Sequence, residues 1–173
     1  MKNPIGFCLT FCALFCLVLA AGLPAQGARG KAELKAGPGS VTVDYGRPEL
    51  KGRDMLAKLE VGKSWRMGSN QATVLTTPVD LTFGGTKLTK GTYSLFLKRE
   101  TAETYHLVFN SQTGQWGTQH DAAKDVAAVP MKKETVTTSV EALTIELKAA
   151  GKGGTFIMTW GTTMLSADFA LGQ

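Results

Sequence analysis

The sequence predicts an all-β protein, an antiparallel β-sandwich with a jelly-roll-like arrangement. Seven segments alternate apolar and polar residues with a period of two, which places one face of each strand on a core. Glycine-containing turns separate many of these segments, and no long helical pattern lies between them, so parallel crossover connections are excluded. The apolar positions are Val41/Val43/Tyr45, Tyr93/Leu95/Leu97, Tyr105/Leu107/Phe109, Val136/Thr138/Val140, Leu143/Ile145/Leu147, Phe156/Met158/Trp160 and Leu165/Ala167/Phe169.

Two further local patterns refine this prediction. Gly84-Gly85 fits a two-residue hairpin turn between short strands at 80–83 and 86–89, and Gly161 is expected to end the strand that contains Trp160. One short helix is predicted over residues 54–61, because Asp54 can cap its start, three apolar side chains share one side, and Gly62 can end it. A helix of two turns needs packing against the sandwich to be stable.

The first 27 residues have the pattern of a secretory signal peptide. Lys2 gives a positive start, residues 5–21 form an apolar run, and Ala25-Gln26-Gly27 offers small residues for cleavage. The alternative, a transmembrane anchor, needs about 20 apolar residues and is the weaker interpretation. We therefore expect residues 28–173 to form a single β-sandwich domain that is periplasmic or secreted, with no stable membrane insertion after cleavage.

Cysteine and charge distribution exclude several classes of function. Cys8, Cys12 and Cys16 all lie in the apolar run, so the mature protein is expected to have no thiols, and no metal or other cofactor is predicted. The formal net charge is +5, but the basic residues are scattered along the chain. A surface that follows nucleic-acid phosphates needs clustered Lys and Arg, so no nucleic-acid partner is expected.

Several short motifs occur in an order that resembles the bacterial domain of unknown function 2911 family. This resemblance covers nearly the whole mature chain and implies an exported, mostly β domain of environmental bacteria, with no established activity. Two positions depart from the family pattern: Ser69 stands where alanine is more common, and Gly46 where serine or another small residue is common. The motifs are Tyr45-Gly46-Arg47-Pro48, Lys51-Gly52-Arg53, the segment from Trp65 to Thr73, the segment from Gly91 to Phe96, Phe109-Asn110 and Trp116-Gly117.

The segment from Lys63 to Asn70, KSWRMGSN, is the best candidate for a site. Trp65 and Arg66 are adjacent, so in an extended segment only one of them enters the core, and Trp65 is the expected core residue. Arg66 would then face outward with other donors that suit carboxylate, phosphate or sugar hydroxyl groups. In the alternative interpretation, the arginines pair with internal carboxylates and turn carbonyls. The predicted ligand-binding residues are Arg47, Arg53, Trp65, Arg66, Asn70 and Trp116, with Tyr45 as a further candidate.

Catalysis has little support in the sequence, and no catalytic residue is predicted. His106 and His120 are the two histidines. A Ser-His-Asp arrangement would need Ser94 or Ser111 beside His120 and Asp121, and such a triad is recognised by geometry rather than composition. Carboxylates at Asp44, Glu49, Asp54 and Glu60 leave a glycoside-hydrolase type of chemistry open, since their separation decides it.

Three functions therefore remain open. The first is a non-enzymatic binding or interaction module for a small polar or anionic ligand, with a glycan as one option. The second is a carboxylate-dependent hydrolase of the cell envelope, which would use the carboxylates around Asp44 to Asp54 or the His120-Asp121 loop. The third is a structural partner of an envelope assembly, which would need an unpaired sheet edge or an exposed apolar patch. The sequence leaves the oligomeric state open.

Overall fold

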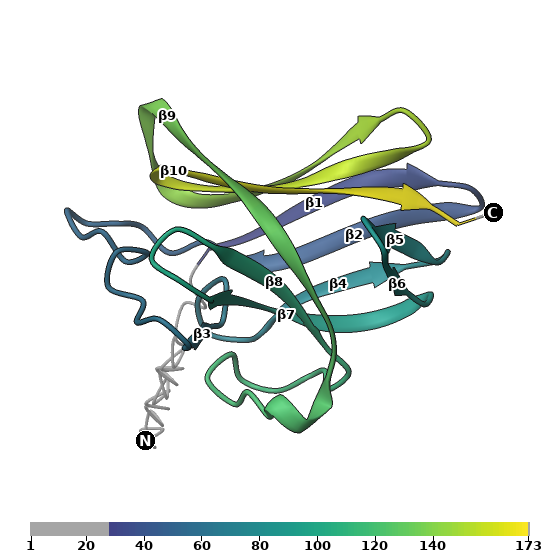
Figure 1. Cartoon of the computed structure of the whole chain (residues 1–173), viewed down its shortest axis with the longest axis horizontal. Helices are drawn as coiled ribbons and strands as arrows, with labels where there is room; N and C mark the ends of the chain where they lie inside the picture. The colour runs from purple at the N-terminus through teal and green to yellow at the C-terminus, as the bar shows by residue number, and fades with distance from the viewer. Residues whose placement is uncertain (1–27, 173) are drawn as a thin grey trace, which may run out of the picture.

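The computed structural model describes residues 28–172, and the predicted signal peptide lies outside them. These residues form ten strands and one 3₁₀ turn, and all strand pairs are antiparallel (Figure 1). The all-β antiparallel prediction is confirmed. The elements are β1 (Arg29–Ala36), β2 (Gly39–Gly46), β3 (Ser64–Trp65), β4 (Thr73–Thr77), β5 (Leu81–Phe83), β6 (Thr86–Leu88), β7 (Gly91–Arg99), β8 (Tyr105–Asn110), η1 (Ala122–Lys124), β9 (Asp125–Ala150) and β10 (Gly153–Leu171).

The strands are joined in the order β1-β2-β4-β7-β8-β9-β10-β5-β6, and β3 pairs with β7 beyond the start of β4. Most neighbours in the sheet are therefore neighbours along the chain, as expected for short antiparallel connections. The β5–β6 hairpin departs most from chain order, since β4 pairs directly with β7 and the hairpin joins the far edge through the end of β10. Its turn at Gly84-Gly85 is the one predicted, with Phe83 opposite Thr86. No helix among the described residues is long and apolar enough to span a membrane.

Strand β9 folds the sheet over on itself. Its first part pairs with β8, up to Tyr105 opposite Met131, and its last part pairs with β10, up to Ala150 opposite Gly153. Figure 1 shows the β9–β10 hairpin lying over β1 and β2, and β9 contacts β1 directly. Residues that were predicted to form separate strands at 136–140 and 143–147 thus belong to one bent strand. Val136 and Val140 are only partly buried, because this part of β9 crosses between the layers.

Gly161 does not end a strand as predicted. Strand β10 continues through it with a register shift, and Gly161 has φ +63°. An irregularity with a left-handed residue bends a strand without ending its pairing, and glycine adopts that conformation without steric cost. This bend allows β10 to follow β9 from one layer to the other.

The core lies between the two layers and is built from the other six alternating segments. Val43, Leu95, Leu107 and Met158, the central residues of four of these segments, are fully buried. Tyr45 is also a core residue, 3% exposed. Its hydroxyl accepts a hydrogen bond from the amide of Ile145 (3.0 Å) and lies 3.3 Å from the carbonyl of the same residue. These contacts connect β2 to β9, so Tyr45 holds the two layers together and is not open to a ligand.

The helix predicted over residues 54–61 is wrong, because the segment forms a series of turns. Asp54 does accept the amide of Ala57 (2.9 Å), as a helix cap would, and Gly62 does have a positive φ of 81°. The guanidinium of Arg99, however, donates to the carbonyls of Ala57 (3.3 Å) and Leu59 (2.7 Å). Those carbonyls are bonded to Arg99 instead of to amides later in the segment, and a segment of eight residues is too short to hold a helix by its own hydrogen bonds.

Candidate functional site

A hollow of about 400 Å³ lies beside the segment singled out in the sequence. It is bordered by the turn segment, by β3 and β7, and by the loop that follows β8. Aromatic, cationic and hydroxyl side chains all contribute to its walls. The lining residues are Met55, Ser64, Trp65, Arg66, Phe96, Gly117, Thr118 and His120.

Trp65 forms an aromatic wall of the hollow, and Trp160 packs against its ring. It lies in β3 opposite Leu97 of β7, and its ring stacks on Trp160 with centroids 5.2 Å apart and an interplanar angle of 12°. The indole Nε1 of Trp160 donates to the carbonyl of Glu141 (3.2 Å), and this residue is only 4% exposed. Trp65 is partly buried and packs against the core, in agreement with the role expected for it.

Arg66 is the cation of the hollow. Its Nε donates to the carbonyl of Gly68 (3.1 Å), which fixes the start of the guanidinium. The loop after β8 packs on its aliphatic stem, because a Cβ at Gly117 would lie 2.7 Å from Cδ of Arg66. Within residues 28–172, no carboxylate lies within ion-pair distance of Arg66. The guanidinium is therefore positioned without being neutralised.

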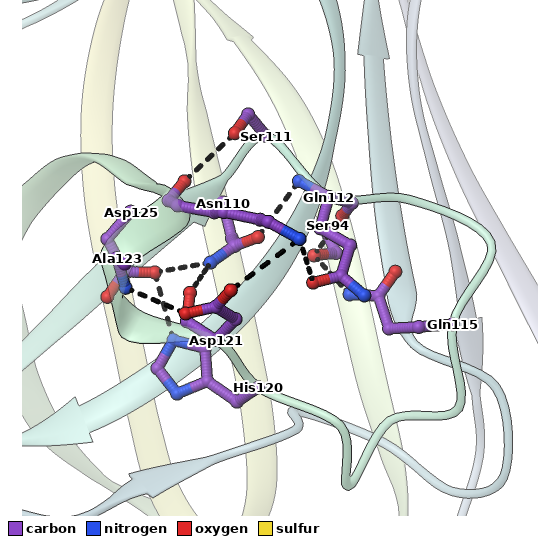
Figure 2. Close-up of polar contacts among 10 residues, drawn as sticks. Ser94, Asn110, Ser111, Gln112, Gln115, His120, Asp121, Ala123 and Asp125 are labelled. Carbon is purple, nitrogen blue, oxygen red and sulfur yellow. Dashed lines mark hydrogen bonds and ion pairs between the residues drawn. The ribbon is translucent and has the colours of Figure 1, made fainter.

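His120 also lines the hollow and is oriented by a polar network around the buried Asn110 (Figure 2). Its Nε2 lies 2.9 Å from Oδ1 of Asp125, and the same oxygen accepts a hydrogen bond from Nδ2 of Asn110 (2.7 Å). The imidazole also stacks on Phe96, with centroids 4.1 Å apart. Because a carboxylate can only accept, the hydrogen of the pair belongs to Nε2 of His120.

Asn110 organises the loop that carries His120. Its side chain is fully buried, and its amide also donates to the carbonyl of Asp121 (2.8 Å), while its oxygen accepts the amide of Gln112 (2.9 Å). Asp121 in turn caps the 3₁₀ turn η1 by accepting the amide of Ala123 (3.1 Å). One asparagine therefore holds both ends of the loop and the carboxylate behind His120.

The six residues predicted to bind a ligand do not share one hollow. Trp65 and Arg66 line the hollow described above, whereas Arg53 lines a second hollow of about 300 Å³ together with Trp160, Asp54 and Glu141. The stacked tryptophans lie between the two hollows, since each hollow is lined by one of them.

Arg47 lines neither of these two hollows. Its Nε donates to the carbonyl of Leu143 on β9, at 3.2 Å.

Asn70 and Trp116 lie next to the first hollow without lining it. The carbonyl of Asn70 accepts the amide of Gly117 (2.8 Å), and Asn70 has φ +63°, a left-handed conformation that asparagine tolerates. Trp116 forms an isolated bridge with Gln71 and is 47% exposed. Both residues therefore hold or flank the loop that borders Arg66.

No Ser-His-Asp arrangement forms among the described residues. His120 contacts Asp125 rather than Asp121, while Ser94 donates to the carbonyl of Gln112 (2.7 Å) and Ser111 to that of Lys124 (3.1 Å). His120 and Phe96 were not predicted as site residues. The sequence offered one indication, since His120 and Asp125 are only five residues apart. The turn at η1 is what brings their side chains into contact.

Three of the four carboxylates that left hydrolysis open have partners within the protein. Asp44 pairs with Arg29, Glu49 lies 4.0 Å from Lys51, and Asp54 caps its own turn. No group of three His, Cys, Asp or Glu side chains able to hold a metal ion occurs in the described part of the chain.

Comparison with known proteins agrees with the motifs that run from Tyr45 to Gly117. The family model described as protein of unknown function (DUF2911) matches residues 28–169. Neither the curated proteins nor the solved structures that were searched include a match. Because the family model covers most of the sequence, the chain belongs to the DUF2911 family.

Proposed function

We propose that this protein is an exported binding module for a small anionic ligand, which it holds in the hollow beside Arg66. The observation that carries the proposal is the guanidinium of Arg66. It lines an open hollow, is positioned by Gly68 and Gly117, and has no carboxylate partner in the described part of the chain. A guanidinium with a free fork of donors suits a carboxylate or phosphate group.

The rest of the hollow supports a ligand with both a charged and a flat apolar part. Trp65 offers aromatic surface, and Ser64 and Thr118 offer hydroxyl groups, while Phe96 is buried at 1% exposure. The volume of about 400 Å³ falls in the range of small-molecule sites. An acid attached to a ring, including the ring of an acidic sugar, combines these features.

Export of the binding module is supported by the pattern of the first 27 residues. We propose a periplasmic or secreted location. The scattered positive charge supports a small molecule rather than nucleic acid as the partner.

A carboxylate-dependent hydrolase of the cell envelope is the second candidate. Asp54 and Glu141 both line the second hollow, which favours this candidate. Each carboxylate, however, accepts a backbone amide, that of Ala57 for Asp54 and that of Lys51 for Glu141 (2.8 Å). Carboxylates with structural partners support binding and folding more than acid–base chemistry.

A thermal-shift screen of small carboxylates, phosphate esters and acidic sugars tests the binding proposal. A ligand at ten times its Kd should stabilise the protein by about 1.4 kcal/mol, which raises Tm by about 3–6 °C for a domain of this size. In Arg66→Gln the shift should disappear, because the fork of donors is lost while much of the aliphatic stem remains.

Arg53→Gln is the matched control, since Arg53 lines only the second hollow. We expect this variant to keep the full ligand-induced shift, with each variant compared with its own ligand-free Tm. A shift that survives in Arg66→Gln and disappears in Arg53→Gln would move the site to the second hollow and contradict the proposal.

A further inference from the structure

We infer that Gly117 is a positioning residue of the hollow beside Arg66. Because Gly117 has no side chain, its loop can lie against the stem of Arg66 and hold the guanidinium in the orientation that a bound acid needs. This inference rests on the proposed function and deepens it. It assigns a role in binding to a residue that offers the ligand no charged group and acts through Arg66.

The close approach of Gly117 to Arg66 is the first support. A Cβ built on Gly117 would lie 2.7 Å from Cδ and 3.1 Å from Cβ of Arg66, and 3.0 Å from the carbonyl oxygen of Asn70. Non-bonded carbon atoms pack best at about 3.5–4.0 Å, so a larger residue would displace one of its neighbours. The φ angle of Gly117 is not positive. The close packing, and not a left-handed backbone, is therefore what favours glycine here.

Backbone pairing holds the loop of Gly117 in place and is the second support. The amide of Gly117 donates to the carbonyl of Asn70 (2.8 Å). On the same two segments, the amide of Ala72 donates to the carbonyl of Gln115 (3.2 Å). These hydrogen bonds oppose a movement of the loop away from the arginine. We therefore expect the side chain of Arg66 to give way when residue 117 is enlarged.

The hydrogen bond of Arg66 indicates what such a displacement would remove. Its Nε donates to the carbonyl of Gly68 (3.1 Å), whereas Nη1 and Nη2 make no hydrogen bond within residues 28–172. These two nitrogens carry most of the N–H donors of a guanidinium, so they remain for an acid in the hollow. A displaced stem would weaken the bond to Gly68 and change the direction of this fork of donors, on which bidentate binding depends.

Calorimetry with benzoate on Gly117→Ala tests the inference, because benzoate is an ionised acid on a flat ring. We expect its Kd to rise about tenfold or more, since a charge-assisted hydrogen bond to the carboxylate is lost. The Nε–H signal of Arg66, assigned by its absence in Arg66→Gln, should also shift in the nitrogen-15 spectrum of the ligand-free variant. A loss of stability alone would change neither measurement while the protein is folded.

Gly85→Ala is the matched control, because it adds the same methyl group in open space. Gly85 lies in the β5–β6 turn, nothing lies within 4 Å of a Cβ built there, and its φ is not positive. We expect this variant to keep the Kd for benzoate and the position of the Arg66 signal.

A double variant tests the packing without any ligand, and it applies even if Gly117→Ala is strongly destabilised. Arg66→Ala removes Cδ, the atom nearest to the added methyl group. The loss of Tm caused by Gly117→Ala should therefore be smaller in the Arg66→Ala background than in the natural protein, because residues in contact are not additive. An equal loss in both backgrounds would contradict the packing of Gly117 on the arginine stem and overturn the inference.

Failure of this inference is distinct from failure of the proposed function. If Gly117→Ala binds benzoate with unchanged Kd, or if the Arg66 signal does not shift in that variant, the role of Gly117 is overturned and the binding module stays intact. If neither benzoate nor any acid of the thermal-shift screen binds the natural protein, the proposed function is overturned, and the role of Gly117 in binding is overturned with it.

Discussion

Replacement of Trp160 by alanine should lower the free energy of unfolding by about 3–5 kcal/mol. The residue is 4% exposed, its ring stacks on Trp65, and its Nε1 donates to the carbonyl of Glu141. The variant loses the buried surface, the stack and one hydrogen bond at once, and it leaves a cavity that the β9–β10 bend cannot fill. Equilibrium unfolding in urea measures the difference.

Trp116→Ala is the control, because it removes a tryptophan that is exposed instead of buried. This residue is 47% exposed and stacks on no other ring in the described part of the chain, so we expect a loss below about 1 kcal/mol. Equal losses in the two variants would contradict the assignment of Trp160 as the buried support of the hollow.

Asn110→Leu should destabilise the protein by about 3 kcal/mol. The substitution keeps the approximate volume of the side chain but removes its hydrogen bonds to Asp125, Asp121 and Gln112. The amide of Gln112 and the carbonyl of Asp121 would then lose their partners near the core, which costs more than the bonds themselves contribute. Urea unfolding, together with hydrogen exchange of residues 111–124, measures the effect.

Ser111→Ala provides the comparison on the same loop. Ser111 is exposed and its hydroxyl makes one hydrogen bond, to the carbonyl of Lys124, so removal of the hydroxyl should change stability by no more than about 0.5 kcal/mol. If Asn110→Leu were equally mild, the hydrogen bonds of Asn110 would not be what holds the loop and its histidine in place.

The alternation of apolar and polar residues along the strands made the fold predictable. It failed at two places, the long strand β9 and the segment predicted as a helix. The period of two identifies the inward faces of most strands, because burial on one face is a property of the strand itself. It does not show that β9 crosses between layers at Val136 and Val140, which depends on how two distant strands pair. The helix failed for a similar reason: Arg99, far along the chain, takes the carbonyls of Ala57 and Leu59.

The candidate site was predictable only where its residues are close in sequence. Trp65 and Arg66 lie next to each other in an unusual segment, and the structure places both in one hollow. Arg47 and Arg53 looked equally suitable by type, but the backbone directs them to other surfaces. His120 was not selected, because its partner Asp125 and its stacking partner Phe96 come together only through the turn at η1 and the pairing of β7, β8 and β9.

Chemical-shift mapping of benzoate binding on nitrogen-15-labelled protein at pH 6 tests the central claim most directly. If the hollow beside Arg66 is the binding site, saturable amide shifts should be largest at residues 64–67, 96 and 117–120. The largest shifts at residues 50–54 and 160–163, which border the second hollow, would contradict the assignment.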